Sequence, residues 1–173
     1  MAPGLKYGLI AAAGMIAWML GEYALGLHTT RIGLGHYTSW ATEVILIVAL
    51  WRLLHHRLYQ AGRYWLPVWE GLLHGVFASL VAAMSFYIFL SLYLHFLNPD
   101  YPDLALEWQV AQMRTAGKPE EEIRLMARGM RWSLSPVGLP VTVFGLYLLI
   151  GVVASPLLTL WLNWRHKEPV HSS

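Results

Sequence analysis

The chain contains no cysteine, and this absence excludes disulfide scaffolds, cysteine-ligated zinc, iron–sulfur clusters and thiol nucleophiles. Charge is also scarce: Asp, Glu, Lys and Arg make up only 13% of the 173 residues, compared with about 25% in soluble domains. So few charges exclude an ordinary water-soluble globule. The formal net charge is +2, but the basic residues flank apolar runs instead of forming a stripe, so we expect no nucleic-acid partner.

Hydrophobic residues make up 57% of the chain and gather in four long runs. The runs cover about residues 5–27, 37–54, 66–97 and 139–164, and each reaches the roughly 17–25 residues that a transmembrane helix needs. The third run would be about 48 Å long as a helix, so it should tilt or project into water. The sequence therefore predicts an all-α integral membrane protein, a four-transmembrane-helix bundle that forms a single membrane domain over residues 1–173.

Between the third and fourth runs, residues 98–136 are polar and charged. A helix can start near Asp103 and stop at Gly117, and Pro119 followed by three glutamates is typical of the start of a second helix. The segment therefore predicts an extramembrane amphipathic helical hairpin. Its apolar faces pack on the bundle or the lipid interface, or they form a docking site for another protein. The partner-docking candidates are Leu106, Val110, Met113, Ile123, Met126 and Met130.

Basic residues in the short loops indicate the orientation in the membrane. If the N-terminus is cytoplasmic, the opposite side has only Arg31 in its short loop, and six basic residues lie on the cytoplasmic side: Lys6, Arg52, Arg57, Arg63, Arg165 and Lys167. The long polar segment adds five basic residues to the opposite side, so the short loops alone decide. We expect a multi-pass protein with both termini in the cytoplasm. The first run is long for a signal peptide, so we expect it to remain as a span.

Several short motifs are spread over nearly the whole chain. They are Leu5-Lys6-Tyr7-Gly8-Leu9-Ile10, Glu22-Tyr23-Ala24-Leu25-Gly26-Leu27-His28, Tyr37-Thr38-Ser39-Trp40, Asn98-Pro99-Asp100, Gln109-Val110-Ala111-Gln112-Met113-Arg114 and Glu120-Glu121-Glu122-Ile123. Together they resemble a bacterial membrane family catalogued as domain of unknown function 4199. The resemblance implies a four-span protein of the bacterial inner membrane with a helical insertion before the last span, and it implies no activity. The sequence departs from the expected Gly-x-Ser/Thr helix start at Gly117-Lys118-Pro119, where proline can replace the cap.

Two glutamates inside the predicted spans need an explanation, because a charge at the bilayer centre costs about 2.5–3.5 kcal/mol on insertion scales. Glu22 and Glu43 lie roughly 7–9 Å below the outer interface on adjacent antiparallel helices. They are therefore a candidate pair that shares a proton or holds a cation. His28 and His36, in the loop between these helices, are candidate ligands or proton relays. The alternatives are local hydrogen bonding with solvated histidines, or a catalytic site.

Glu70 and His74 are four residues apart and therefore share a helix face. The spacing allows two ligands to one metal ion, but three or more are normally needed. Only His55 and His56 could supply others, so the metal signal is weak and a hydrogen-bonded structural pair is the competing interpretation. No other residue pattern indicates a cofactor.

Small residues recur every four positions in the first and third runs, a spacing that lets helix backbones approach closely in lipid. The helix-packing candidates are Gly4, Gly8, Ala12, Gly71, Gly75, Ser79 and Ala83. They predict either contacts within the bundle or association between subunits.

The sequence contains no nucleophile elbow, P-loop, dinucleotide fingerprint or His-Glu-x-x-His motif, so we expect no enzymatic activity. The leading hypothesis is a non-enzymatic accessory, scaffolding or assembly subunit of a membrane complex. Its partners would be the lipid bilayer and either other membrane subunits or a second copy of the chain. The alternative is a small oligomeric cation- or proton-handling membrane protein that uses Glu22 and Glu43.

Overall fold

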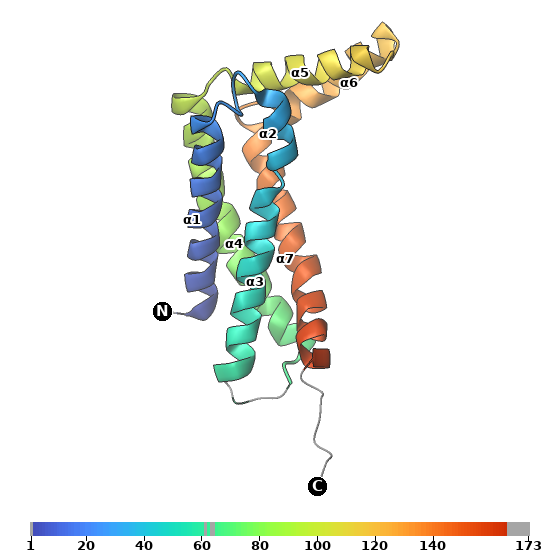
Figure 1. Cartoon of the computed structure of the whole chain (residues 1–173). Helices are drawn as coiled ribbons and strands as arrows, with labels where there is room; N and C mark the ends of the chain where they lie inside the picture. Colours follow the sequence, from blue (N-terminus) through green and yellow to red (C-terminus); the bar gives the residue numbers. More distant parts are fainter. Residues whose placement is uncertain (1, 61, 63–64, 166–173) are drawn as a thin grey trace.

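The computed structural model describes residues 2–60, 62 and 65–165 of the chain. Within them every regular element is a helix (Figure 1). In chain order the helices are α1 (Pro3–Ala24), α2 (Ile32–Thr38), α3 (Ala41–Gln60), α4 (Val68–Leu92), the π-helical turn η1 (Tyr93–Leu97), α5 (Tyr101–Thr115), α6 (Glu120–Ser133) and α7 (Gly138–Arg165). Arg63 and Lys167, two of the residues that predict the orientation, lie outside the described residues.

Four helical stretches are long and apolar enough to cross a membrane: Pro3–Ala24, Ile32–Tyr59, Val68–Leu97 and Gly138–Arg165. These helices indicate a membrane protein. Neighbouring stretches run in opposite directions, so the start of α1 and the end of α7 lie at the same end of the bundle (Figure 1).

The predicted ends of the first two spans are wrong by a few residues. The first helix stops at Ala24 instead of continuing to residue 27, because Gly26 has φ +74° and turns the chain. The second span begins at Ile32 instead of residue 37, because a short helix occupies the predicted loop. Apolar composition continues through both turns, so hydropathy alone does not mark them.

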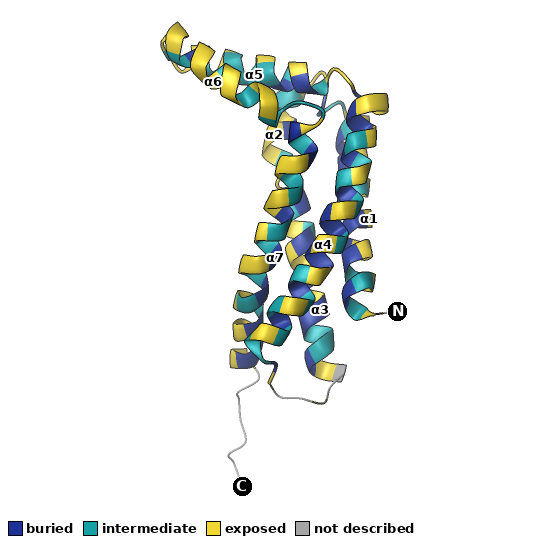
Figure 2. Ribbon diagram, turned by 180° about the vertical axis from the view of Figure 1, so that it is seen from behind, coloured by how far each residue is buried: buried dark blue, intermediate teal, exposed yellow. Residues whose placement is uncertain are grey.

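α4 is the central helix and packs against α1, α3 and α7. The side chains buried around it are almost all apolar and include Met15, Leu50, Ala82, Phe86 and Tyr147. Large apolar side chains also cover the outside of the bundle, among them Leu73, Ile88, Leu149 and Leu157 (Figure 2). A soluble monomer rarely exposes so much contiguous apolar surface, whereas lipid would cover it.

Small residues allow the helices around α4 to approach closely. A side chain on Gly71 or Gly75 would collide with the hydroxyl group of Thr159 or Ser155 on α7. A side chain on Gly8 of α1 would lie 2.7 Å from a backbone oxygen of α4. The predicted packing residues are all buried within this chain: Gly4, Gly8, Ala12, Gly71, Gly75, Ser79 and Ala83.

α5 and α6 lie side by side at the end of the bundle opposite the start of α1 (Figure 1). Gly117, with φ +72°, reverses the chain between them. Arg114 donates to the Glu120 carboxylate at 2.9 Å, and Lys118 donates to Glu122 at 2.6 Å. Both helices extend sideways past the bundle (Figures 1 and 2), and we call them the arm.

Candidate functional site

α2 forms the start of the second span, and most of it falls in the segment that the sequence predicts to be a loop. This helix has no side-chain cap and contains two glycines, so its sequence lacks the usual start signals. Gly35 packs directly on the Leu27 carbonyl group, where a larger residue would collide. This close approach brings Thr38, the last residue of α2, to the end of α1.

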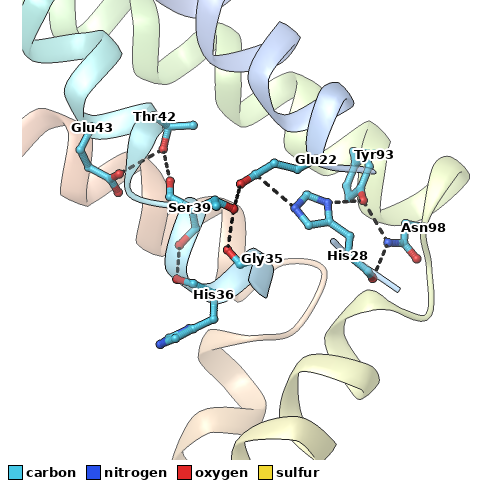
Figure 3. A network of polar contacts seen from close by, with 10 residues as sticks. Glu22, His28, Gly35, His36, Ser39, Thr42, Glu43, Tyr93 and Asn98 are labelled. Atoms are coloured by element: carbon cyan, nitrogen blue, oxygen red, sulfur yellow. Dashed lines mark hydrogen bonds and ion pairs between the residues drawn. The ribbon is translucent and has the colours of Figure 1, made fainter. Parts of the chain in front are cut away.

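Two ionisable side chains are buried beside Thr38. Glu22, near the end of α1, and His28, in the following turn, are only 4% and 5% exposed. The Oε2 atom of Glu22 lies 3.4 Å from Nε2 of His28, and the Thr38 hydroxyl group donates to Oε1 of Glu22. Both carboxylate oxygens therefore have a partner (Figure 3).

The other side of His28 contacts the end of the third span. Its Nδ1 atom lies 2.7 Å from the Tyr93 hydroxyl group. The Asn98 amide donates to that hydroxyl group at 2.9 Å and to the His28 carbonyl oxygen at 3.3 Å. We call Glu22, His28, Thr38, Tyr93 and Asn98 the Glu22 cluster, which joins three spans at the end of the bundle next to the arm (Figure 3).

The donors and acceptors of this cluster form an ordered series that runs from Asn98 to Glu22. The His28 carbonyl oxygen can only accept, so the Asn98 atom beside it is the amide nitrogen. Tyr93 accepts from Asn98 and gives its own hydrogen to Nδ1 of His28. A neutral His28 then carries its proton on Nε2, which faces Glu22. The donors converge on Glu22, as they do around an ionised carboxylate.

Burial affects the protonation of two groups at this end of the bundle. It lowers the pKa of His28 below its ordinary value of about 6.5, although the nearby Glu22 carboxylate opposes this shift. Burial also raises the pKa of the Tyr101 hydroxyl group, and Glu22 adds to that rise. A neutral His28 at neutral pH agrees with the hydrogen-bond directions.

A cavity of about 230 Å³ adjoins the Glu22 cluster. Glu22, His28 and Glu43 all line it, so three of the four predicted ion- or proton-site residues share one cavity. Glu43 accepts a hydrogen bond from the Thr42 hydroxyl group at 3.2 Å. The two glutamates therefore line the same cavity but contact different side chains (Figure 3).

His36, the fourth candidate, is exposed and points away from Glu22 (Figure 3). Its ring packs instead on Trp108 of α5, with the ring centroids 4.9 Å apart. The structure thus separates His36 from the site and places it against the arm, because α2 directs Thr38 and His36 to different sides.

Glu70 and His74 lie toward the other end of α4, with His74 Nε2 3.8 Å from Glu70 Oε1. Arg57 of α3 donates to the same Glu70 oxygen at 3.0 Å, a partner that the i,i+4 spacing does not reveal. Among the residues that the structure describes, no three His, Cys, Asp or Glu side chains are grouped as metal ligands. The contacts link α3 to α4 through an ion pair.

The partner-docking candidates on the arm differ in exposure. Ile123 is buried, Met126 is exposed, and the remaining four are half-buried: Leu106, Val110, Met113 and Met130. The largest exposed apolar side chains of α6 are Leu125 and Trp132, at 70% and 61%, which the sequence analysis does not select. Their seven-residue spacing places both on one helix face.

Three members of the Glu22 cluster, Thr38, Tyr93 and Asn98, are not among the predicted site residues. One signal was available, since Thr38 and Asn98 both belong to motifs that carry the family resemblance. Tyr93 has no such signal, because its role depends on η1 turning its hydroxyl group toward His28.

Comparison with curated proteins and with solved structures gave no significant match. A family model does match, however, and it covers residues 6–163, which include all four candidate spans except their outermost residues. The chain therefore belongs to the family described as Protein of unknown function (DUF4199).

Proposed function

We propose that the protein is a non-enzymatic accessory subunit of a membrane complex and that its arm binds another membrane protein. In this proposal the protein lies in the bacterial inner membrane, both termini are cytoplasmic, and the arm is an amphipathic hairpin on the opposite side. The observation that carries the proposal is the direction of α5 and α6, which extend sideways past the four spans (Figure 1). An arm in this position meets proteins that lie beside the bundle.

The base of the arm packs against the turn after α1 and against α2. Tyr101, the first residue of α5, packs on the His28 ring with the centroids 5.1 Å apart. About two turns further along α5, Trp108 packs on His36. Asn98, just before α5, is hydrogen-bonded within the Glu22 cluster. These contacts hold the base of the arm against the bundle. In this proposal the cluster supports partner binding by positioning the arm.

The exposed surface of α6 suits a protein partner. Leu125 and Trp132 are exposed on one face, and the adjacent face carries the exposed Arg124, Arg128 and Arg131. Tryptophan and arginine are enriched in protein interfaces and among the residues that dominate binding energy.

Photocrosslinking in intact cells tests this proposal. A photoreactive residue at position 125 should give a discrete crosslink to one membrane protein, and Trp132→Asp should weaken it about tenfold or more, because hot-spot residues contribute at least about 2 kcal/mol. The control is the same probe at Leu149, an exposed residue in the middle of α7. If position 125 crosslinks only to lipid, or gives the same products as position 149, the accessory function is contradicted.

A second candidate function, proton binding, is supported by the cavity that Glu22, His28 and Glu43 share. The bundle below this cavity is packed with apolar side chains such as Met15, Leu46 and Leu50. This packing favours proton uptake at the outer end of the bundle over passage across the membrane.

Infrared difference spectroscopy on the protein in lipid tests proton uptake directly. A pH step should produce a carboxyl signal that disappears in Glu22→Gln or Glu43→Gln and persists in Glu121→Gln, an exposed arm residue. If Glu22→Gln and Glu43→Gln both keep the full carboxyl signal, neither glutamate takes up a proton over the pH step, and the second candidate function is contradicted.

A further inference from the structure

A cavity of about 780 Å³ lies between α1 and α3 at the end of the bundle where α1 begins. All residues that line it come from these two helices. Its volume is within the usual range of about 300–1,000 Å³ for small-molecule sites. The cavity is thus an interhelical groove that shares no lining residue with the cavity beside the Glu22 cluster. The start of α1, where the groove lies, is at the end of the bundle opposite the arm (Figure 1).

The walls of the groove are apolar over most of its length. Ile10 and Gly14 of α1 face Val44, Ile45 and Val48 of α3, and the absence of a side chain at Gly14 leaves room beside Ile45. From residue 6 to residue 14 a helix rises about 12 Å, close to the roughly 15 Å of hydrocarbon in one leaflet. The groove therefore has the depth and polarity for an acyl chain.

The mouth of the groove is basic. Lys6 and Arg52 line it together with His55 and His56, and no acidic residue does. The cationic groups of Lys6 and Arg52 lie 5.9 Å and 5.8 Å from the rings of their neighbours Tyr7 and Trp51. Neither of them forms an ion pair with any residue that the structure describes. Two cations above an apolar groove complement an anionic headgroup attached to acyl chains.

We propose that this groove, the basic groove, is a binding site for an anionic phospholipid. The phosphate group lies between Lys6 and Arg52 at the mouth, and one acyl chain follows the wall formed by Ile10, Val44 and Val48. Basic pockets between transmembrane helices bind anionic headgroups in this manner. The lipid would fill the space between α1 and α3 and hold the two helices together at this end.

Native mass spectrometry of the whole protein in mild detergent tests the site, with phosphatidylglycerol and phosphatidylcholine as probes. The protein should retain phosphatidylglycerol preferentially. Lys6→Gln combined with Arg52→Gln should reduce that preference about thirtyfold, because each basic residue near a membrane surface contributes about 1 kcal/mol and about 1.4 kcal/mol corresponds to a tenfold change. Arg165→Gln is the matched control, since Arg165 is an exposed basic residue at the end of α7 and does not line the groove.

A second pair of variants tests the apolar wall. Val48→Trp should fill the groove and release both lipids, whereas Val153→Trp, at an equally exposed position on α7, should not. Retention of phosphatidylglycerol by both groove variants, equal binding of the two lipids by the unmodified protein, or an equal loss in Arg165→Gln would overturn the proposal. Release of phosphatidylglycerol by millimolar inorganic phosphate would also overturn it, because the site would then recognise phosphate alone.

Discussion

At the scale of single residues, the buried Glu22 has polar partners on two sides. Thr38 reaches it from α2, and His28 reaches it from the turn after α1. His28 in turn depends on Tyr93 and Asn98 at the end of the third span. The removal of any one side chain from this series of contacts leaves a buried polar group without its partner, which costs about 1–3 kcal/mol.

Tyr93→Phe should therefore lower the free energy of unfolding by about 1–3 kcal/mol. The substitution keeps the ring but leaves Nδ1 of His28 and one N–H group of Asn98 without their hydroxyl partner. Thermal unfolding in detergent measures the effect, with Tyr37→Phe as the control because Tyr37 is 69% exposed. Equal melting temperatures for the two variants would show that the chain of hydrogen bonds does not stabilise the fold.

His28 should make the protein less stable in mild acid. Its pKa is lowered in the folded protein, mainly by burial, so the unfolded chain binds the proton more tightly. Stability is then complete above about pH 6.5, the unfolded value, and falls as the pH drops toward the folded pKa, at up to about 1.4 kcal/mol per pH unit.

Melting temperatures measured between pH 7.5 and pH 5 should show this fall in the unmodified protein. The fall should be smaller in His28→Gln, and His36→Gln should behave like the unmodified protein because His36 is exposed. If His28→Gln shows the same pH dependence as the unmodified protein, another group is responsible.

The sequence identifies Glu22 and His28 as candidates because acidic residues within apolar runs are rare and stand out. It pairs Glu22 with Glu43 by depth alone and does not identify Thr38 as a partner of Glu22. In the structure Glu22 has Thr38 and His28 as direct partners, and Glu43 only shares the cavity. Depth along a helix follows from residue counting, but the direction of a side chain depends on how α2 packs, which no local pattern reveals.

At the scale of elements, α4 is stabilised by its close contact with α7. Gly75→Ala should lower the free energy of unfolding by about 1–3 kcal/mol, because the added methyl group collides with the side chain of Ser155. Gly145→Ala in α7 is the matched control, since nothing lies within 4 Å of its added methyl group. The control should be neutral or stabilising by up to about 1 kcal/mol. Similar losses in both variants would argue against a tight α4–α7 contact.

The four long helices could be predicted because length and hydropathy dominate for membrane spans. α2 and η1 could not. α2 has only seven residues and no capping side chain, and its apolar residues are indistinguishable from the span that follows. η1 continues the same apolar run as α4 with a wider turn, closed by the Asn98 N–H group on the Tyr93 carbonyl oxygen at 2.9 Å, and apolar composition does not distinguish the two kinds of turn.

At the scale of the whole molecule, the two ends of the bundle differ in chemistry. One end has the Glu22 cluster and the arm, and the other has the basic groove and the Arg57–Glu70 pair. Basic residues in short loops concentrate on the cytoplasmic side of membrane proteins, and the short loop at the arm end has only Arg31, so the groove end is the expected cytoplasmic side. This assignment does not depend on Arg63 or Lys167, because Lys6, Arg52 and Arg57 lie at the same end.

The orientation can be measured cleanly because the chain has no cysteine of its own. Single substitutions Ala2→Cys and Thr115→Cys place a thiol at exposed positions at opposite ends of the molecule, before α1 and at the end of α5. A membrane-impermeant maleimide applied to intact cells should label Thr115→Cys, and it should label Ala2→Cys only after permeabilisation. Leu149→Cys should stay unlabelled in both conditions, because a thiol that faces hydrocarbon does not form the reactive thiolate.

The reverse pattern for the first two variants would place the arm in the cytoplasm. Partner binding would then have to involve cytoplasmic proteins or the cytoplasmic faces of membrane proteins, and the basic groove would open toward the outer leaflet.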